Sequence, residues 1–150
     1  MKALIQRVRE ASVTINGQIH GSIGNGLLIL LGVGVDDDVS DAAKLASRIP
    51  KLRIFNDENG LMNLSCSDAG GEYLVISQFT LLADSRKGNR PSYIKAAKPD
   101  IAIPLYEQFV QEFEKDLEKK VQTGQFGADM KVSLLNDGPV TILIDTKNKE

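Results

Sequence analysis

A chain of 150 residues with a formal net charge of −2 fits one domain, which would bury about 70% of its unfolded surface. Its single cysteine, Cys66, and single histidine, His20, exclude an intrachain disulfide, a site of several cysteines and the usual zinc ligand sets within one chain. Residues 1–7 become charged early, and no apolar run approaches membrane length. We therefore expect one cytoplasmic domain over residues 1–150, with no metal, cofactor or membrane partner.

The N-terminal part is predicted to be a small antiparallel unit. Residues 2–8 and 11–15 alternate apolar and polar side chains, and Asn16-Gly17 is the pair that type I′ hairpin turns prefer. His20 would lie on the exposed return strand. Because a Ser-His-Asp or Cys-His arrangement would have to recruit this residue, a hydrolase with this sequence would work without a histidine base.

The apolar run 27–31 predicts a strand covered on both faces, at the centre of a sheet. Gly32 and Gly34 follow it, in a spacing that also occurs in dinucleotide-binding loops, but the next residues are the acidic run 36–38. Its charge would repel a phosphate. We therefore reject a nucleotide site at this position.

Hydrophobic spacing and turn residues predict the remaining elements. They are a helix over 39–49 that Asp38 or Ser40 caps and Pro50 ends, hairpin strands over 52–55 and 61–64, a helix over 99–121 that Gly124 ends, strands over 130–135 and 140–144, and a frayed tail over 147–150. Hairpins, two packing helices and a central buried strand together predict an α/β domain.

The apolar run 73–76 ends in the stretch 77–81, and its β-branched character predicts a buried strand. Such a strand would bring the polar side chains of Ser77, Gln78 and Thr80 to the rim of the core, where binding sites are commonly built. Alternatively, these groups only satisfy neighbouring backbone. The residues alone leave both interpretations open.

A basic segment, residues 84–99, gathers Arg86, Lys87, Arg90, Lys95 and Lys98 around glycine and proline. Cations neutralise phosphates, while glycine and proline shape a loop. A phosphate-bearing ligand and a solvated loop both fit this pattern. The overall acidity argues against non-specific coating of nucleic acid.

Gly138-Pro139 connects the two last predicted strands. Most such pairs form ordinary turns, and the sequence does not decide between a cis and a trans bond. A Gly-Pro pair can also aim two carbonyl oxygens into a pocket, with no side chain or N–H in the way. Those oxygens would suit an ammonium group.

Four stretches of the chain carry a family pattern. They are residues 1–8, Ser77-Gln78-Phe79-Thr80, residues 88–92, and residues 123–130 continued by Asn136-Asp137-Gly138-Pro139-Val140-Thr141. Together they resemble the bacterial-type D-aminoacyl-tRNA deacylase family over essentially the whole chain. The Ser-Gln-x-Thr and Asn-x-Gly-Pro-x-Thr motifs are jointly specific in order and spacing, although either motif alone would be weak.

The resemblance implies a homodimeric hydrolase that removes D-amino acids, and glycine wrongly attached to alanine tRNA, from the 3′-terminal adenosine of aminoacyl-tRNA. It also implies helices stacked on two β layers, an α/β/β arrangement with mixed sheets and hairpins. Through a cis bond, Gly138 and Pro139 of one subunit would enter the other subunit's site, hold the α-amino group and exclude an L side chain, with Arg7 bracing them. The other implied residues are Ser77, Gln78, Phe79 and Thr80 in catalysis and Asn136, Met130 and Phe126 at the substrate. From the composition of the basic segment we predict that Arg86, Lys87, Arg90 and Lys95 bind the tRNA.

Two mechanisms of ester hydrolysis remain open: attack by Thr80, or attack by water that the terminal ribose 2′-OH helps to activate. We favour the second, because no base for the Thr80 hydroxyl is evident. The strand end would then supply the backbone N–H of Phe79 or Thr80, together with the hydroxyls of Ser77 and Thr80, for positioning and for relief of the oxyanion. The alternative functions are a non-catalytic RNA- or nucleotide-binding module, with Phe79 stacked on the terminal adenine, and a related deacylase of altered chirality.

Overall fold

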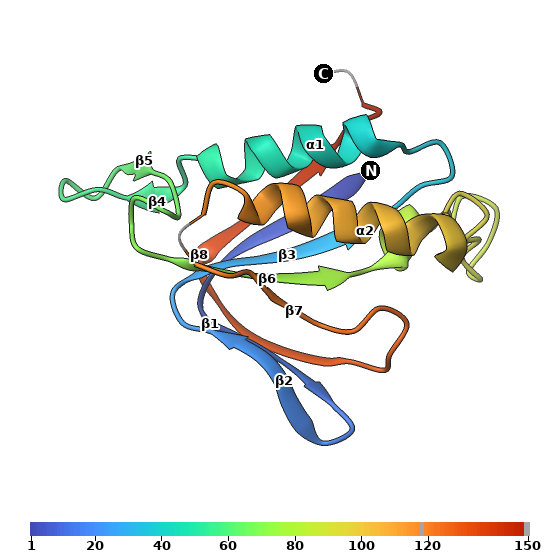
Figure 1. The fold of residues 1–150 in the computed structure, drawn as a ribbon, viewed down its shortest axis with the longest axis horizontal. Coiled ribbons are helices and arrows are strands. Elements are labelled where there is room, and N and C mark those ends of the chain that lie inside the picture. Colours follow the sequence, from blue (N-terminus) through green and yellow to red (C-terminus); the bar gives the residue numbers. More distant parts are fainter. Residues whose placement is uncertain (118, 149–150) are drawn as a thin grey trace.

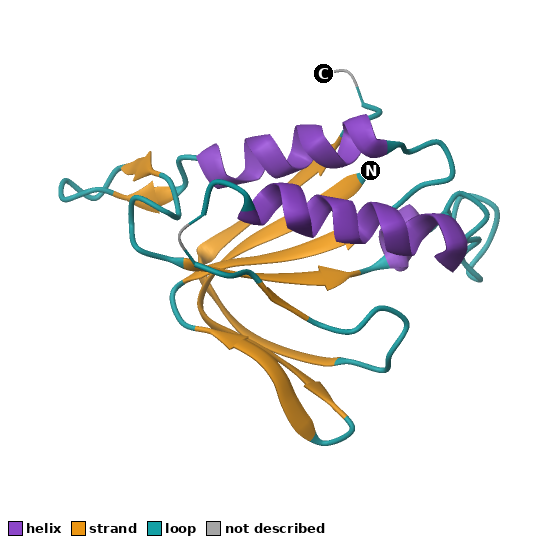
Figure 2. Cartoon of the chain, viewed as in Figure 1, coloured by secondary structure: helices purple, strands orange, loops and turns teal. Residues whose placement is uncertain are grey.

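The computed structural model of the chain describes residues 1–117 and 119–148. They form one mixed sheet of six strands, two α-helices across one face and a separate two-stranded hairpin (Figures 1 and 2). The strands are β1 (Lys2–Ile15), β2 (Gln18–Ile23), β3 (Gly26–Gly32), β4 (Phe55–Asn56), β5 (Met62–Leu64), β6 (Glu72–Ser77), β7 (Gln122–Thr123) and β8 (Lys131–Asp145). The helices are α1 (Val39–Arg48) and α2 (Pro99–Glu114), with short 3-10 helices η1 (Ile49–Lys51) and η2 (Phe79–Leu82). Among the described residues, no helix is long and apolar enough to cross a membrane.

Strand β1 is the element on which the sheet is built. Its first half pairs antiparallel with β3, its second half pairs antiparallel with β2, and β8 runs antiparallel beside both halves. β6 is parallel to β3, and the short β7 is parallel to β6. The predicted Asn16-Gly17 turn is confirmed by the φ angles of 52° and 77° at these residues, since type I′ turns require positive φ at both positions. The predicted central strand is β3, which lies between β1 and β6.

The sheet buries apolar side chains on both of its faces. Leu27 and Ile29 of β3 belong to the core beneath the helices, whereas Leu28 between them belongs to a second core on the other face. In β6, Val75 belongs to the core beneath the helices and Leu74 belongs to the second core. Other members of the second core come from the far half of β1, from β2 and from the start of β8. The sheet therefore curls around this second core and is nearly barrel-like (Figure 1).

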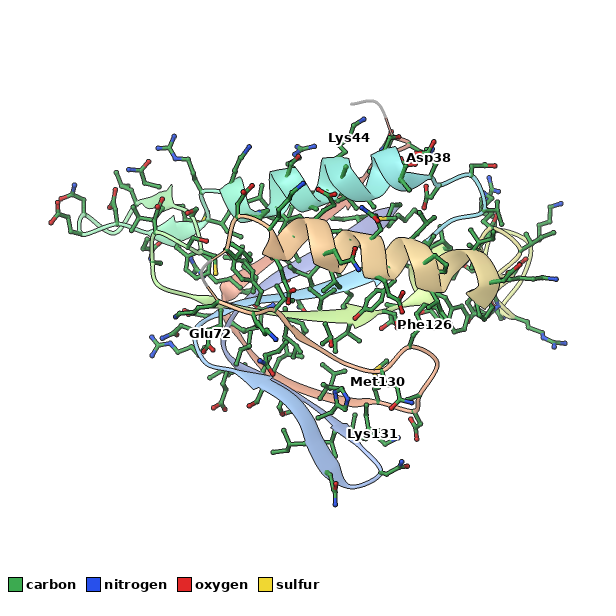
Figure 3. The ribbon with its side chains drawn as sticks, viewed as in Figure 1. Asp38, Lys44, Glu72, Phe126, Met130 and Lys131 are labelled. Carbon is green, nitrogen blue, oxygen red and sulfur yellow. The ribbon has the colours of Figure 1, made fainter. Side chains whose placement is uncertain are left out.

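The first helix begins where its capping residues predict. Asp38 accepts a hydrogen bond from the Ser40 backbone N–H (2.9 Å), and Asp41 accepts one from the Asp38 N–H (2.9 Å). This capping box satisfies N–H groups that the first turn leaves without a helical partner. Figure 3 shows Asp38 at this end of α1. The helix ends at Arg48 and continues as η1 through Pro50, and the predicted hairpin follows as β4 and β5.

The prediction of a helix over 99–121 is wrong at its C-terminal end, because α2 stops at Glu114. Val121 has helical spacing from the preceding apolar residues, but it is buried in the core just before β7. The Val121 N–H donates to the Glu114 carboxylate at 3.0 Å, so the chain turns back instead of extending the helix. Residue 118, which the prediction included, lies outside the described residues.

The prediction of two separate last strands is also wrong. Residues 131–145 form the single strand β8, and the segment 137–140 bulges from it without reversing the chain. The tail was predicted to be frayed, yet Lys147 donates to Asp41 at 3.1 Å. Residues 149 and 150 of that tail lie outside the described residues.

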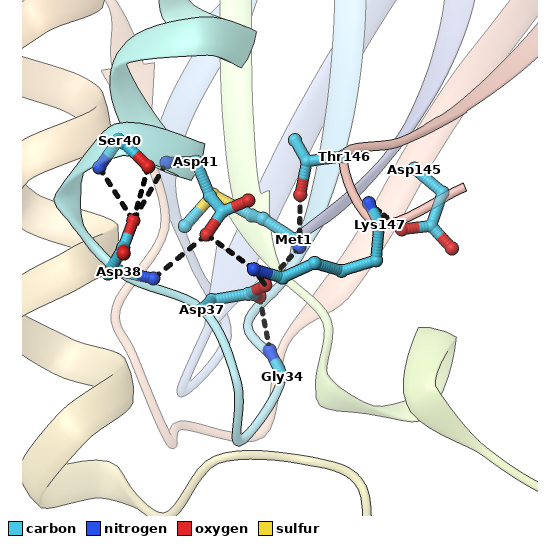
Figure 4. A network of polar contacts seen from close by, with 9 residues as sticks. All are labelled: Met1, Gly34, Asp37, Asp38, Ser40, Asp41, Asp145, Thr146 and Lys147. Carbon is cyan, nitrogen blue, oxygen red and sulfur yellow. Dashed lines mark hydrogen bonds and ion pairs between the residues drawn. The ribbon is translucent and has the colours of Figure 1, made fainter. Parts of the chain in front are cut away.

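The N-terminal ammonium group lies in a buried polar network (Figure 4). It donates to the Asp37 carboxylate and to the Thr146 hydroxyl, the latter at 2.8 Å. The second Asp37 oxygen accepts the Gly34 N–H at 2.6 Å. These contacts join the start of β1, the end of β8 and the loop after β3.

Asp41 extends this network to the C-terminal side. Burial disfavours its charged form, but hydrogen bonds from Thr146, from the Asp38 backbone and from Lys147 outweigh this effect and hold the pKa of Asp41 well below its usual value. A carboxyl whose pKa is lowered in the folded state stabilises the fold above its unfolded pKa of about 4. This contribution disappears as the pH falls below that value towards the folded pKa.

Replacing this carboxylate should therefore lower stability in a pH-dependent way. We expect Asp41→Asn to reduce the free energy of unfolding in urea by about 1–3 kcal/mol at pH 7, and the difference from wild type to shrink as the pH is lowered from 4 to 2. Asp36→Asn is the matched control, because Asp36 is exposed and such changes stay within about 0.5 kcal/mol. A deficit for Asp41→Asn that is the same at pH 7 and pH 3 would contradict the assignment.

Candidate functional site

The end of β6 carries the first half of the candidate site. The Gln78 N–H donates to the Leu31 carbonyl at 2.8 Å, and the chain then turns into η2. Gly32 makes this turn possible, because a Cβ there would lie only 2.7 Å from Leu82 Cδ2 and 3.0 Å from the Gln78 carbonyl oxygen. A side chain at position 32 would push η2 away from the sheet.

A cavity of about 260 Å³ opens beside this strand end. Its lining comes from the end of β6 and from the loop between β7 and β8, and consists of Ile76, Ser77, Gln78, Phe79, Phe126, Gly127, Ala128, Asp129, Met130 and Val132. Five predicted site residues therefore meet at one cavity, although about fifty residues separate the two stretches. Thr80 does not line the cavity, but its hydroxyl accepts a hydrogen bond from the Gln78 amide.

The loop from β7 to β8 holds Phe126 and Met130 against this cavity (Figure 3). The Phe126 ring packs edge-on against Tyr106 of α2, with ring centroids 6.1 Å apart. Gly124 leaves space for Met130, because a Cβ at position 124 would lie 2.5 Å from the Met130 sulfur. The packing of Gly124 and Met130 thus sets the position of the Met130 side chain in the wall.

Gly138 and Pro139 lie in the bulge of β8 and are joined by a cis peptide bond. In the pairing of β1 with β8, Gln6 stands opposite Thr141 and Val8 opposite Asn136, so residues 137–140 face Arg7 alone. The largely buried Arg7 guanidinium donates to the carbonyls of Asp137 (2.9 Å) and Ile54 (2.8 Å). Arg7 therefore ties the bulge to the base of the β4–β5 hairpin.

Asn136 closes the bulge from within β8. Its side-chain oxygen accepts the Val140 N–H at 3.0 Å, and its amide nitrogen donates to the Thr141 hydroxyl at 3.1 Å. Gly138 and Pro139 are exposed. In the described chain, Asn136 contacts the bulge and does not line the cavity.

The cavity and the bulge lie in different regions of one chain. Ser77 stands opposite Leu31, and Leu31 opposite Ala3, four residues along β1 from Arg7. Three strand spacings separate β6 from β8. At about 3.3 Å per residue and 4.8 Å per strand, the bulge lies roughly 20 Å from Ser77. One chain does not bring Gly138-Pro139 to the cavity.

The basic segment forms a closed loop beside η2. Asp84 and Ser92 exchange two backbone hydrogen bonds of 2.8 Å. The Asp84 carboxylate pairs with Arg86 at 2.6 Å and with Lys95 at 3.7 Å, and the Arg86 hydrogen bond holds the pKa of Asp84 well below its usual range. Two of the predicted tRNA-binding cations are therefore partly neutralised by an acid that the sequence reasoning did not consider, while Lys87 and Arg90 stay exposed.

Few titratable groups of the described chain are placed to act as a base here. Asp129 lines the cavity but pairs with Lys131 at 3.1 Å, and His20 contacts the Thr123 carbonyl at 3.0 Å on the outer hairpin. Burial raises the pKa of the Cys66 thiol to about 11, so Cys66 is protonated at neutral pH. No group of three or more His, Cys, Asp or Glu side chains in residues 1–117 and 119–148 is arranged to hold a metal ion.

Comparison with known proteins adds independent findings. Residues 4–145 match the family model described as D-Tyr-tRNA(Tyr) deacylase. Similar proteins from Flavobacterium psychrophilum and Bacteroides thetaiotaomicron, both named D-aminoacyl-tRNA deacylase, are 63% and 60% identical, with all of both chains aligned.

Solved structures resemble the whole chain as well. One named "c-Myc DNA Unwinding Element Binding Protein" superposes with a TM-score of 0.93 at 37% identity, covering 99% of this chain and 100% of that one. A probable eukaryotic D-amino acid tRNA deacylase superposes with a TM-score of 0.77 at 15% identity, over 95% of this chain and 97% of that one, and shares the fold.

Proposed function

The chain belongs to the D-Tyr-tRNA(Tyr) deacylase family, and on this premise we propose that the cavity at the end of β6 binds the aminoacylated 3′-terminal adenosine. The enzyme hydrolyses the ester bond of D-aminoacyl-tRNA and releases the free amino acid and tRNA. Glycine attached to alanine tRNA is included in the proposal, since it also lacks an L side chain. The observation that carries the site assignment is the meeting of Ser77, Gln78 and Phe79 with Phe126 and Met130 around one cavity.

The proposed mechanism uses position and backbone donors instead of a side-chain nucleophile. Thr80 already accepts a hydrogen bond from Gln78, and among the described residues no His or carboxylate is hydrogen-bonded to its hydroxyl. A hydroxyl without a base is a weak nucleophile. The terminal ribose 2′-OH would help to activate water, while the N–H of Phe79 or Thr80 would stabilise the oxyanion.

Selection of the D form is assigned to a second copy of the chain. Because Gly138-Pro139 lies roughly 20 Å from Ser77 within one chain, it can complete the cavity only from another subunit. Strand β8, which carries the pair, has β1 as its sheet partner within the described residues and exposes Leu134, Leu135 and Leu143. An edge strand with exposed apolar side chains favours association with another chain. The carbonyls of Gly138 and Pro139 would then hold the α-amino group and exclude an L side chain.

The basic segment is assigned to the tRNA backbone. Arg86, Lys87, Arg90 and Lys95 lie on the loop that adjoins η2, where phosphates next to a bound 3′ end would pass. We also propose that residues 1–150 form a single cytoplasmic deacylase domain whose helices lie on two β layers. The two buried cores on opposite faces of the sheet support that layering.

A second candidate function is a nucleic-acid-binding module without catalysis. The name of the structural relative at 37% identity favours it. The two functions differ in whether bound substrate is cleaved, which a direct assay decides.

Purified protein should release D-tyrosine from D-tyrosyl-tRNA and leave L-tyrosyl-tRNA intact. We expect single-turnover rates that differ by roughly 100-fold or more, since a steric clash with the L side chain would destabilise both the bound substrate and the transition state. The measurement is the loss of radiolabelled tyrosine from each tRNA under excess enzyme. Saturable binding without release would support the module, and equal release of both forms would contradict Gly138-Pro139 as a chiral filter.

The role of the ribose is tested with tRNA that ends in 2′-deoxyadenosine. We expect its D-tyrosyl ester to be hydrolysed roughly 100-fold more slowly or worse, because one positioned acid–base group is lost. Thr80→Ala should retain activity on the normal substrate. Full activity on the deoxy substrate, with an inactive Thr80→Ala and an active Thr80→Ser, would instead identify Thr80 as the nucleophile.

The shared site is tested by mixing two inactive variants. Gly138→Ala strains a residue with a φ of 135° and adds a Cβ 3.0 Å from Arg7, whereas Ser77→Phe places a ring in the cavity. If each site uses both chains, a heterodimer contains one intact site, so a refolded equimolar mixture should recover about a quarter of wild-type activity. A mixture as inactive as its components would contradict the shared site.

A further inference from the structure

Two exposed aromatic side chains form a pair at the edge of the candidate site. Phe79 of η2 and Tyr93 of the basic segment pack edge to face, with ring centroids 5.1 Å apart. Their exposed fractions are 54% and 40%, so much of both rings faces solvent. Neither residue belongs to one of the two buried cores. Packing of the fold therefore does not explain why the rings are placed together.

The loop around Tyr93 is held at both ends by backbone hydrogen bonds. The Asp84–Ser92 pair closes one side, and on the other side the Val35 N–H donates to the Lys95 carbonyl at 3.0 Å. The Ala96 N–H donates to the Tyr93 carbonyl at 3.0 Å. These bonds fix the backbone of Tyr93 next to η2 while its ring stays exposed. An exposed ring on an anchored backbone is suited to contact a ligand with little loss of entropy.

The position of the pair relative to the cavity indicates what the ligand would be. Phe79 lines the cavity, whereas Tyr93 lies outside its lining. Tyr93 is thus one ring further from the bound adenosine, towards the basic segment. Residues 84–98 contain five basic residues and one acidic residue, so a chain that leaves the cavity past Tyr93 meets positive charge. Single-stranded nucleic acid is bound by this combination of stacking aromatic rings and cations.

We propose that Tyr93, supported by Phe79, stacks on the base of the nucleotide that precedes the terminal adenosine of the tRNA. This inference rests on the proposed function of the cavity. It extends the site from the esterified adenosine to the unpaired 3′ end. Tyr93 is a binding residue and takes no part in bond cleavage, so its loss should raise KM and leave kcat unchanged.

Three D-tyrosyl esters separate stacking from the other contacts. They are the esters of adenosine, of a dinucleotide with an abasic ribose before the adenosine, and of cytidylyl-adenosine. The first two differ in the phosphate and the abasic ribose, and the last two differ only in the base. For wild-type protein we expect KM to be roughly tenfold lower for cytidylyl-adenosine than for the abasic dinucleotide, in the range of one stacked base.

Tyr93→Leu should abolish this tenfold difference, and Tyr93→Phe, which keeps the ring, should retain it. All variants should hydrolyse the adenosine ester with wild-type kcat and KM. Ile94→Ala is the matched control, because Ile94 is the exposed neighbour of Tyr93, with an exposed fraction of 81%, and it should behave as wild type on all three esters. Circular dichroism checks that each variant is folded.

Two results would overturn the inference. One is a Tyr93→Leu protein that keeps the preference for cytidylyl-adenosine, which would mean that the base contacts another residue. The other is a Tyr93→Leu protein that is equally impaired on the adenosine ester, which would mean that Tyr93 only supports Phe79. If wild-type protein releases no D-tyrosine from any ester or from tRNA, the proposed function itself fails and the inference fails with it.

Discussion

The fold depends on strand β1, which is paired on both sides and changes its buried face midway. Ala3 and Ile5 point into the core under the helices, whereas Ala11 and Val13 point into the second core. Ile5 and Ala11 are six residues apart, so a regular strand would direct both side chains to the same face. They lie in different cores because the strand is irregular between them, where the pairing with β8 shifts register between Gln6 and Glu10. A shift of one residue exchanges the two faces of a strand, so one strand serves both cores and the sheet can curl.

The same irregularity creates the second half of the candidate site. Where β1 passes from one core to the other, residues 137–140 of β8 have Arg7 as their counterpart in the pairing and bulge outward. Arg7 satisfies the Asp137 carbonyl that the disrupted ladder leaves free, as buried backbone groups require. Exposure of Gly138 and Pro139 is therefore a consequence of strand register, and it places them on an edge where another chain can meet them.

Local patterns predict the elements whose signals are confined to a few residues. The Asn16-Gly17 turn, the Asp38 cap and the buried strand before Ser77 are of this kind. The end of α2 was not predictable, since Leu117 and Val121 continue the helical spacing and only the contacts of the folded chain turn it back. Residues 137–140 have the composition of a turn. They form a bulge instead, because β1 pairs with the residues of β8 that precede them and with those that follow them. Motif resemblance predicts both halves of the candidate site, but their separation within one chain depends on strand order.

Charge and stacking would have different roles in the proposed binding of the 3′ end of the substrate. The protein is acidic overall, and Asp84 neutralises part of the basic segment by pairing with Arg86 and Lys95. Binding through phosphates alone would be weak in physiological salt, because salt screens each contact. Such contacts also carry no sequence information. The proposed stacking on Phe79 and Tyr93 would be less sensitive to salt than phosphate contacts and would require an unpaired base. A deacylase that bound its substrate in this way would contact the unpaired 3′ end and would need few contacts with the duplex beyond it.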